Sequence, residues 1–324
     1  MSPSAPGFGA CLVKVAVIGP GALGCLLAIK FRLAGEEVCL VDHRPERAGL
    51  LSRQGLVLRT PQGTATKVQM PVLLAGEAGP VDLAILAVKA YQTATAVSAL
   101  PRLLSAGGVA LTLQNGLGNL EEMARAVGPA RLLGGASILG ATKLREGEVL
   151  LAGLGPTYIG PPPASQVSAA EVEAVAALFR RAELPCEIRG DIEAVLWEKL
   201  LVNVGLNPLT ALLQVKNGDL LSIPPAWELA VAAATEAKEV ARASGIDLAV
   251  DPGARLKEVC LATAANRSSM LQDITAGRRT EIEALNAQVA TRGEKLGVPT
   301  PVNHFLTLLI RGLEEAKKER GGGG

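Results

Sequence analysis

Residues 13–24 read Val13-Lys-Val-Ala-Val-Ile-Gly-Pro-Gly-Ala-Leu-Gly24, and the apolar run Cys25–Leu33 follows them. The residues before Gly19 are typical of a buried strand, and the run after Gly24 predicts a helix. The spacing Gly-x-Gly-x-x-Gly between a strand and a helix is the fingerprint of a dinucleotide-binding loop. The predicted cofactor contacts in this loop are Gly19 at the tight turn, Gly21 under the pyrophosphate, Gly24 at the helix–sheet contact, and Ala22 and Leu23 between them.

The rest of the chain divides into two patterns. Short Val/Leu/Ile runs alternate with helical segments up to about residue 190, which indicates a parallel sheet covered on both faces. Long Ala/Leu-rich helical patterns follow. We therefore expect an α/β chain, with a Rossmann-type, mostly parallel sheet domain at residues 11–190 and an all-helical substrate domain at residues 191–320.

The expected elements can be assigned to residue ranges. Strands are predicted at 13–18, 37–41, 83–88, 109–113, 132–139 and 186–189, and Val149 with 157–159 is predicted to form a hairpin. Helices are predicted at 25–33, 168–183, 194–213, 225–244, 252–263, 269–277, 280–296 and 301–318, with capping boxes at Ser269-x-x-Gln272 and Thr280-x-x-Glu283.

Composition limits the class of partner. The 324 residues carry a net charge of only +1, and no basic cluster is interleaved with aromatics, so nucleic acid and membrane surfaces are poor candidates. Five scattered cysteines without a Cys-x-x-Cys pair indicate reduced thiols in a cytoplasmic protein, and two histidines are too few for a histidine-based metal site. Apolar helical faces such as Ala230–Ala234 and Leu306–Ile310 are either core or the seam of a homodimer.

Polar residues that follow the predicted strands give further cofactor contacts. Asp42 stands where a carboxylate accepts the ribose 2′-hydroxyl of NAD, whereas Arg44 stands where a guanidinium holds the 2′-phosphate of NADP. Lys89 and Asn115 come directly after two buried strands, where ligands collect in such sheets. The alternative for these residues is an ordinary loop charge or a turn, because Asn-Gly is a common turn dipeptide.

A polar ridge marks the first long helix. Lys199, Asn203 and Asn207 are four residues apart among apolar neighbours, so they share one helix face. Burial of an ammonium and two amides is unfavourable unless each has partners, which suggests a cleft for a polar ligand. The alternatives are a structural ion pair for Lys199 and, for the amides, service to backbone groups such as the Val204 carbonyl that Pro208 leaves unpaired.

These segments together resemble the ketopantoate reductase (2-dehydropantoate 2-reductase) family. The resemblance runs in order along nearly the whole chain. It rests on Gly19–Gly24, Val88-Lys-Ala-Tyr-Gln92, Leu113-Gln-Asn-Gly-Leu-Gly118, Gly140-Ala-Thr142, Trp197-Glu-Lys-Leu200, Asn203, Asn207–Ala211, Asn217-Gly-Asp219, Asn266–Asp273 and Arg279-Thr-Glu281.

The resemblance implies NADPH-dependent reduction of the 2-keto acid ketopantoate to pantoate, a step toward pantothenate and coenzyme A. It implies catalytic roles for Lys199, as proton donor, and Glu281, which also reaches the cofactor side. It further implies substrate contacts at Asn115, Lys199, Asn203, Asn207, Asn217, Asn266 and Ser269, and cofactor contacts at Lys89, Gln92, Asn115 and Ala141.

Several alternatives stay open at this point. Asp42 departs from the usual basic pattern of NADPH-dependent members, so NAD remains a candidate cofactor. The enzyme could act on another 2-keto or 2-hydroxy acid, and a regulatory protein that senses NADP without turnover is a further option. Asn217 could be a turn residue, Ser269 a helix cap, and Glu281 an acid that complements a helix dipole.

Overall fold

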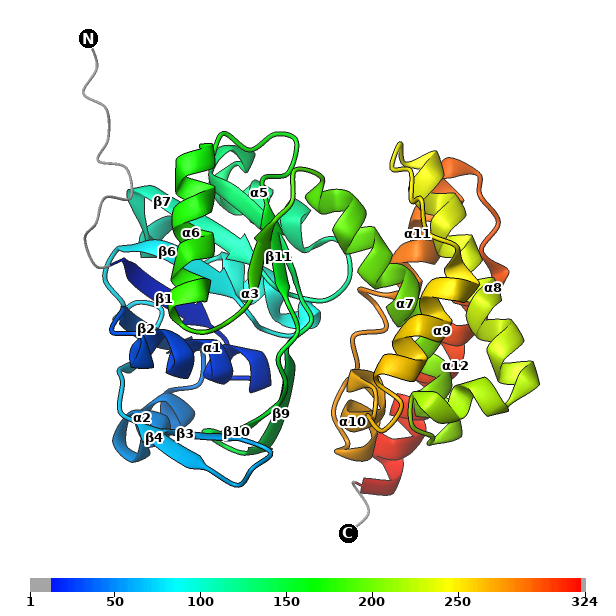
Figure 1. Ribbon diagram of the computed structural model, residues 1–324, viewed down its shortest axis with the longest axis horizontal. Coiled ribbons are helices and arrows are strands. Elements are labelled where there is room, and N and C mark those ends of the chain that lie inside the picture. The colour runs from blue at the N-terminus through cyan, green and yellow to red at the C-terminus, as the bar shows by residue number, and fades with distance from the viewer. Residues whose placement is uncertain (1–12, 322–324) are drawn as a thin grey trace. The chain divides into compact units, whose positions relative to one another are not determined.

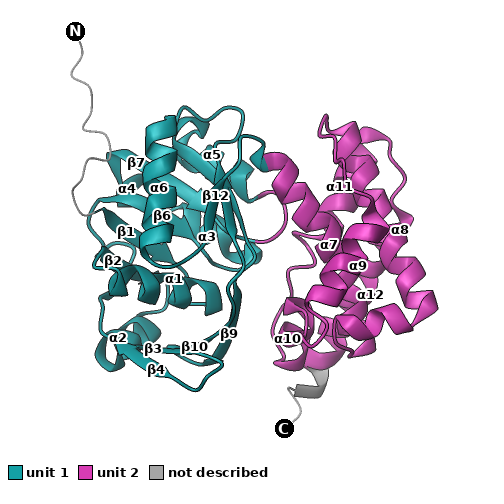
Figure 2. Ribbon diagram, viewed as in Figure 1, with its two compact units in different colours: residues 1–114, 119–192 teal, residues 115–118, 193–324 magenta. Residues whose placement is uncertain are grey.

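The computed structural model describes residues 13–321, with side chains described as far as Lys318, so Cys11 lies outside the described part of the chain. The chain forms two compact units (Figure 2). Unit 1 contains residues up to 114 and residues 119–192, and unit 2 contains residues 115–118 and 193 onward. None of the helices within residues 13–321 combines the length and apolar character needed to cross a lipid bilayer.

Unit 1 is a Rossmann-like α/β unit built on one large sheet (Figure 1). The order of its eight strands is β12-β11-β8-β7-β6-β1-β2-β5, and all neighbours are parallel except β8 and β11. The strands are β1 (Lys14–Ile18), β2 (Glu37–Asp42), β5 (Val72–Leu74), β6 (Val81–Leu86), β7 (Leu104–Thr112), β8 (Leu132–Ser137), β11 (Thr157–Gly160) and β12 (Cys186–Ile188). The prediction of a mostly parallel sheet is confirmed.

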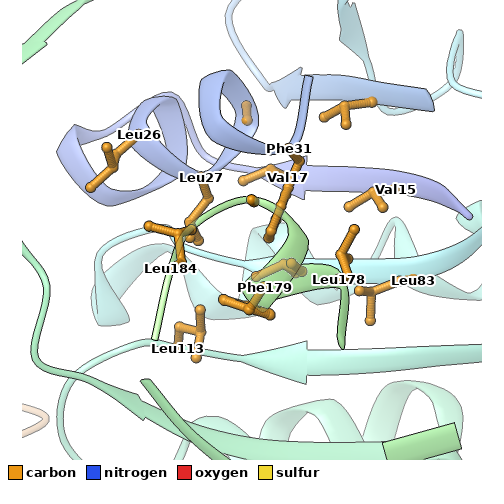
Figure 3. Close-up of a cluster of buried hydrophobic side chains, with 14 of the residues drawn as sticks. Val15, Val17, Leu26, Leu27, Phe31, Leu83, Leu113, Leu178, Phe179 and Leu184 are labelled. Atoms are coloured by element: carbon orange, nitrogen blue, oxygen red, sulfur yellow. The ribbon is translucent and has the colours of Figure 1, made fainter. Parts of the chain in front are cut away.

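Helices cover both faces of this sheet, as the unbroken apolar strands require. The helices of unit 1 are α1 (Ala22–Leu33), α2 (Pro45–Gln54), α3 (Thr93–Val97), α4 (Leu100–Leu103), α5 (Asn119–Val127) and α6 (Ala169–Arg181), with short 3-10 turns η1 (Ala90–Gln92) and η2 (Pro129–Arg131). Alternate strand residues enter two separate cores. On the α1 and α6 side the rings of Phe31 and Phe179 meet edge to face, with centroids 5.1 Å apart (Figure 3).

A second, four-stranded sheet lies against α1 and was not foreseen. Its order is β4-β3-β10-β9, formed by β4 (Ala65–Val68), β3 (Leu56–Arg59), β10 (Glu148–Gly153) and β9 (Gly140–Arg145). The predicted hairpin between Val149 and residues 157–159 is therefore wrong. Val149 pairs with Leu58 and Lys143 in the small sheet, whereas β11 pairs with β8 and β12 in the large one.

The order of the large sheet indicates where unit 1 would bind a ligand. The chain leaves β1 toward β2 and β5 on one side, then returns to β6 on the other side of β1. Strand order reverses between β1 and β6, and sheets of this kind bind their ligands at the carboxyl ends of the strands at such a point. The glycine loop follows β1 at this point.

Unit 2 is all-helical within its described residues. It contains α7 (Ile192–Leu213, of which Ile192 still belongs to unit 1), η3 (Gly218–Ser222), α8 (Pro224–Ala243), α9 (Pro252–Ala262), α10 (Ser269–Thr275), α11 (Asn286–Leu296) and α12 (Pro301–Gly321). Ala230, Ala233 and Ala234 pack in its core together with Leu306 and Ile310. The Ala230–Ala234 face and the Leu306 and Ile310 side of α12 are therefore core, whereas Leu308 and Leu309 of the same range are exposed.

Two helix starts differ from the prediction. Ser268, not Ser269, caps α10, because its hydroxyl accepts from the Leu271 N–H at 3.1 Å. The predicted helix at 280–296 begins only at Asn286, because residues 280–285 form a series of turns instead. Glu281 and Asn286 consequently lie on a turn and at a helix start, a geometry that the helical pattern did not indicate.

Candidate active site

The glycine loop fits a bound dinucleotide. Gly19 has a φ of +108°, and an added Cβ would lie 2.6 Å from the Val88 side chain. A Cβ on Gly24 would lie 1.9 Å from the Gly19 carbonyl oxygen, so α1 can approach the loop only without a side chain there. At Gly21 the nearest atom to such a Cβ is 3.8 Å away, and no side chain in the described part of unit 1 caps the N-terminus of α1. The space beside Gly21 is open, and the N–H groups of the first turn of α1 that follow it are suited to bind an anion such as pyrophosphate.

A buried hydrogen-bond network holds the neighbouring loop after β6. The Gln114 amide donates to the Val88 carbonyl at 3.1 Å and to the Thr93 hydroxyl at 2.7 Å. That hydroxyl lies 2.9 Å from the side-chain oxygen of Asn119. Both ends of the segment that carries Lys89 and Gln92 are thus fixed to the polypeptide after β7.

Asp42 already has an ion-pair partner within unit 1. Its carboxylate is buried, with 2% exposure, and accepts two hydrogen bonds from the Arg47 guanidinium. Loss of hydration raises the pKa of Asp42, but the hydrogen bonds and charge of Arg47 outweigh it and leave the pKa below the ordinary value. The carboxylate is therefore ionised and its charge is neutralised within unit 1.

The other cofactor candidates of unit 1 lie on separate segments. Arg44 is exposed at the N-cap of α2, and its guanidinium lies 4.0 Å from the Glu146 carboxylate. Lys89 is the N-cap of η1, and Gln92 ends it. Ala141 belongs to β9 of the small sheet and packs partly buried against the core that contains α1. Unit 1 alone brings the glycine loop and the Lys89 loop together, since Gly19 faces Val88.

Helix α7 places the lysine of the polar ridge in a poorly hydrated position. Loss of hydration lowers the pKa of the partly buried Lys199 from 10.5 to about 8, and the negative charge of Glu281 opposes part of that shift. Asn203 is also partly buried, and Asn207 is buried with 4% exposure. An ammonium with a pKa near neutrality is suited to general acid catalysis at physiological pH.

The turn at residues 281–285 forms hydrogen bonds with the loop that carries Asn115. The Asn115 amide donates to the Glu281 carboxylate at 3.2 Å, and the Leu117 N–H donates to the Ala284 carbonyl at 3.0 Å. Gly116 passes so close to Ala284 that a Cβ there would lie 2.1 Å from the Ala284 carbonyl oxygen. Glu281 therefore contacts Asn115 directly and influences Lys199 through its charge.

The remaining predicted substrate contacts gather at the end of α7. The Asn207 amide lies 3.4 Å from the hydroxyl of Ser269, which is exposed. Asn217 donates to the Thr263 hydroxyl at 2.9 Å, and its backbone N–H donates to the carbonyl of the exposed Asn266. The side-chain oxygen of Asn217 is buried without a protein partner among the described residues. Unit 2 thus brings Asn207 to Ser269 and Asn217 to Asn266.

The carbonyl that Pro208 leaves unpaired has a different partner from those considered above. The Asn286 amide donates to the Val204 carbonyl at 2.9 Å, so Asn203 and Asn207 are not needed for this task. One structural explanation of the two ridge amides is thereby removed. Asn286 itself is fully buried.

Comparisons with known proteins agree with this arrangement. Residues 15–164 match the family described as ketopantoate reductase PanE/ApbA, and residues 191–314 match its C-terminal part. The chain belongs to the ketopantoate reductase family. It is therefore an oxidoreductase, as the motifs of both units indicate.

Similar members of this ketopantoate reductase family come from archaea. The chain is 36% identical to the 2-dehydropantoate 2-reductase of Archaeoglobus fulgidus, over 93% of this chain and 98% of that one. It is 37% identical to the 2-dehydropantoate 2-reductase of Halobacterium salinarum, over 92% and 98% of the two chains.

Solved structures show the same fold. A ketopantoate reductase from Ralstonia eutropha is 28% identical with a TM-score of 0.83, over 94% of this chain and 99% of that one. A D-mandelate dehydrogenase in ternary complex with NADH and anilino(oxo)acetate is 26% identical with a TM-score of 0.86, over the same shares of the two chains.

The roles of three residues of the site were not predicted from the sequence. Arg47 neutralises Asp42, Gln114 holds the Lys89 loop, and Asn286 pairs the Val204 carbonyl that Pro208 leaves without a helical donor. The signal for Gln114 was its place directly after a buried strand. The signal for Asn286 was a lone amide in an apolar pattern, but its partner is 82 residues away along the chain.

Proposed function

We propose that this enzyme reduces 2-dehydropantoate (ketopantoate) to pantoate with NADPH, and that Lys199 is the proton donor. The observation that carries the proposal is the α7 ridge. There an ammonium with a pKa of about 8 lies within the influence of Glu281 and is followed by Asn203 and Asn207 on the same helix face. The identity of the substrate is inferred from the names of the relatives, and the mechanism is inferred from the residues of this chain.

In this reaction the reduced nicotinamide, when bound, supplies a hydride to the keto carbon. Negative charge then develops on the keto oxygen, and Lys199 neutralises it by donating a proton there. A pKa of about 8 keeps most of the amine protonated at neutral pH and still allows ready release. Glu281 limits the fall of that pKa and holds the Asn115 amide.

Neutral hydrogen-bonding groups are assigned to the substrate. Asn115, Asn203, Asn207, Asn217 and Ser269 would hold its carboxylate and hydroxyl groups without bringing a competing negative charge, and Asn266 would support Asn217 through the backbone.

The cofactor assignment rests on Arg47 and Arg44. Asp42 is buried and its carboxylate is already paired with the Arg47 guanidinium, which disfavours its use as the acceptor for a ribose 2′-hydroxyl. Arg44 is exposed and weakly paired, as a guanidinium that grips a 2′-phosphate would be before binding. The glycine loop, with Ala22 and Leu23 at the first turn of α1, would hold the pyrophosphate, and Lys89, Gln92 and Ala141 would line the cofactor site.

A second candidate function is supported by one structure. The D-mandelate dehydrogenase with NADH shares the fold at a TM-score of 0.86, so NADH-dependent reduction of another 2-keto acid is the alternative. A non-catalytic NADP sensor would have no use for a lysine of lowered pKa.

The setting of the enzyme is also proposed. The four cysteines in the described residues are free, which suits the cytoplasm and a role in the pathway to pantothenate and coenzyme A. Phe305, Leu308 and Leu309 form an exposed apolar face of α12, at 63%, 47% and 55% exposure, and this face is the candidate homodimer seam.

The test is a panel of 2-keto acids, ketopantoate among them, assayed with NADPH and with NADH. The proposal predicts the highest kcat/KM with ketopantoate and NADPH. A higher kcat/KM with another keto acid and NADH would establish the alternative, and cofactor binding without turnover of any keto acid would establish the sensor.

A further inference from the structure

The starting observation is a missing helical hydrogen bond inside the continuous helix α7, between Asn203 and Asn207. Pro208 has no N–H to offer, so the carbonyl of Val204 loses its helical partner in the middle of the catalytic ridge. The Asn286 side chain supplies the missing donor from α11, at 2.9 Å. Val204 and Asn286 are fully buried, so loss of this hydrogen bond would leave the Val204 carbonyl without a water partner and would be unfavourable.

A second set of bonds holds Asn286 from behind. Its amide also donates to the Asn303 side-chain oxygen at 3.0 Å. Asn303 in turn donates to the Ala233 carbonyl and to Glu236, which also accepts from the N–H groups of Val302 and Asn303. The bond to α7 therefore ends a network that spans α8, α11 and α12.

The position of Asn286 along the chain gives this bond a further consequence. Asn286 is the first residue of α11 and directly follows the turn at 281–285. That turn carries Glu281, which holds Asn115, and Ala284, which holds Leu117. The Asn286 side chain thus links the turn that carries Glu281 to α7, the helix that carries Lys199.

We propose that Asn286 is a positioning residue, which fixes Lys199 on α7 relative to Glu281 and Asn115 by pairing the Val204 carbonyl. This inference rests on the proposed function, in which Lys199 donates the proton. A shift of about 1 Å in such a group can cost on the order of a hundredfold in rate, so one buried bond suffices to matter.

The first measurement does not depend on any substrate. The reactivity of the Lys199 amine toward an acylating reagent is followed by mass spectrometry as a function of pH, which gives its pKa directly. Glu281→Gln is expected to lower this pKa in the wild-type background, because the charge of Glu281 raises it. In the Asn286→Leu background the same substitution is expected to shift the pKa by less than half as much. An equal shift in both backgrounds would overturn the proposal.

The second measurement is turnover of ketopantoate. We expect Asn286→Leu to lower kcat about tenfold or more, with KM for NADPH within about twofold of wild type. Asn303→Leu is the matched control, because it removes buried amide bonds of the same network but leaves the bond to Val204. It should lose stability and retain kcat. An equal loss of kcat in both variants would reduce Asn286 to a structural residue and contradict the proposal.

Pro208→Ala gives a rescue, since alanine restores the N–H that pairs the Val204 carbonyl within α7. In this background Asn286→Leu should leave kcat within about twofold, a coupling that a double-mutant cycle measures. Comparison of Pro208→Ala with the double variant Pro208→Ala/Asn286→Leu also tests the proposal if Asn286→Leu alone does not fold. A tenfold loss of kcat on adding Asn286→Leu to Pro208→Ala would refute the positioning role of Asn286. If the wild-type enzyme does not reduce ketopantoate, the proposed function fails, while the Lys199 titration still decides the role of Asn286.

Discussion

The pKa of Lys199 predicts how the reaction depends on pH. Only the ammonium form can donate a proton, so kcat/KM for keto-acid reduction should follow the protonated fraction of the free enzyme. With a pKa of about 8, that fraction is about nine-tenths at pH 7 and about one-tenth at pH 9. We expect a nearly flat profile below pH 7 and a fall that approaches about tenfold per pH unit above about pH 9.

The cause of the shift can be tested in the same assay. Burial lowers the pKa of Lys199 and Glu281 partly restores it, so Glu281→Gln should move the falling limb to lower pH. Glu283→Gln is the matched control, because it makes the same chemical change two residues away on a carboxylate that Arg311 holds. It should leave the limb in place. A rate that is constant from pH 7 to 10, or a limb that Glu281→Gln moves to higher pH, would refute the reasoning.

Two further predictions concern the residues assigned to the cofactor site, one for Arg44 and one for the glycine loop. Arg44→Ala should raise KM for NADPH about tenfold or more and leave KM for NADH within about twofold, because a charge-assisted bond to the 2′-phosphate contributes about 1.5–3 kcal/mol; equal effects on both cofactors would remove Arg44 from this role. Gly24→Ala should lower the free energy of unfolding by about 1–3 kcal/mol, because its Cβ would lie 1.9 Å from the Gly19 carbonyl oxygen. Gly21→Ala, with 3.8 Å of clearance, should retain that stability but weaken NADPH binding, as thermal unfolding and a fluorescence titration can measure. Equal stability of the two variants would contradict the assigned roles.

Much of the large sheet could be predicted because its information is local. Runs such as Val13–Ile18 and Leu83–Leu86 are apolar on both faces, and the glycine spacing after the first run marks the β1 turn independently. The small sheet was missed because its strands are short and half-polar. β3 pairs with β10, whose residues are about ninety positions later, and no local pattern encodes such a partner.

The site shows the same division. The four-residue spacing of Lys199, Asn203 and Asn207 places them on one face of α7, which a helical period alone implies. The pairing of Asp42 with Arg47 requires a particular side-chain conformation of Arg47, and Ser268, which caps α10, also accepts a hydrogen bond from the distant Thr210. The turns at 280–285 replaced a predicted helix because Ala284 and Glu281 bind the Asn115 loop there. Partners distant in the sequence accompany the last two features, which the local pattern therefore did not reveal.

The most direct test of the central claim is single-turnover reduction of ketopantoate by Lys199→Ala with NADPH bound, compared with Lys216→Ala, which removes an exposed lysine of the same unit. We expect the rate of Lys199→Ala to fall at least about a hundredfold while its affinity for NADPH stays within about twofold, and the rate of Lys216→Ala to stay unchanged. A folded Lys199→Ala enzyme that binds NADPH and reduces ketopantoate at a near-normal rate would contradict the account.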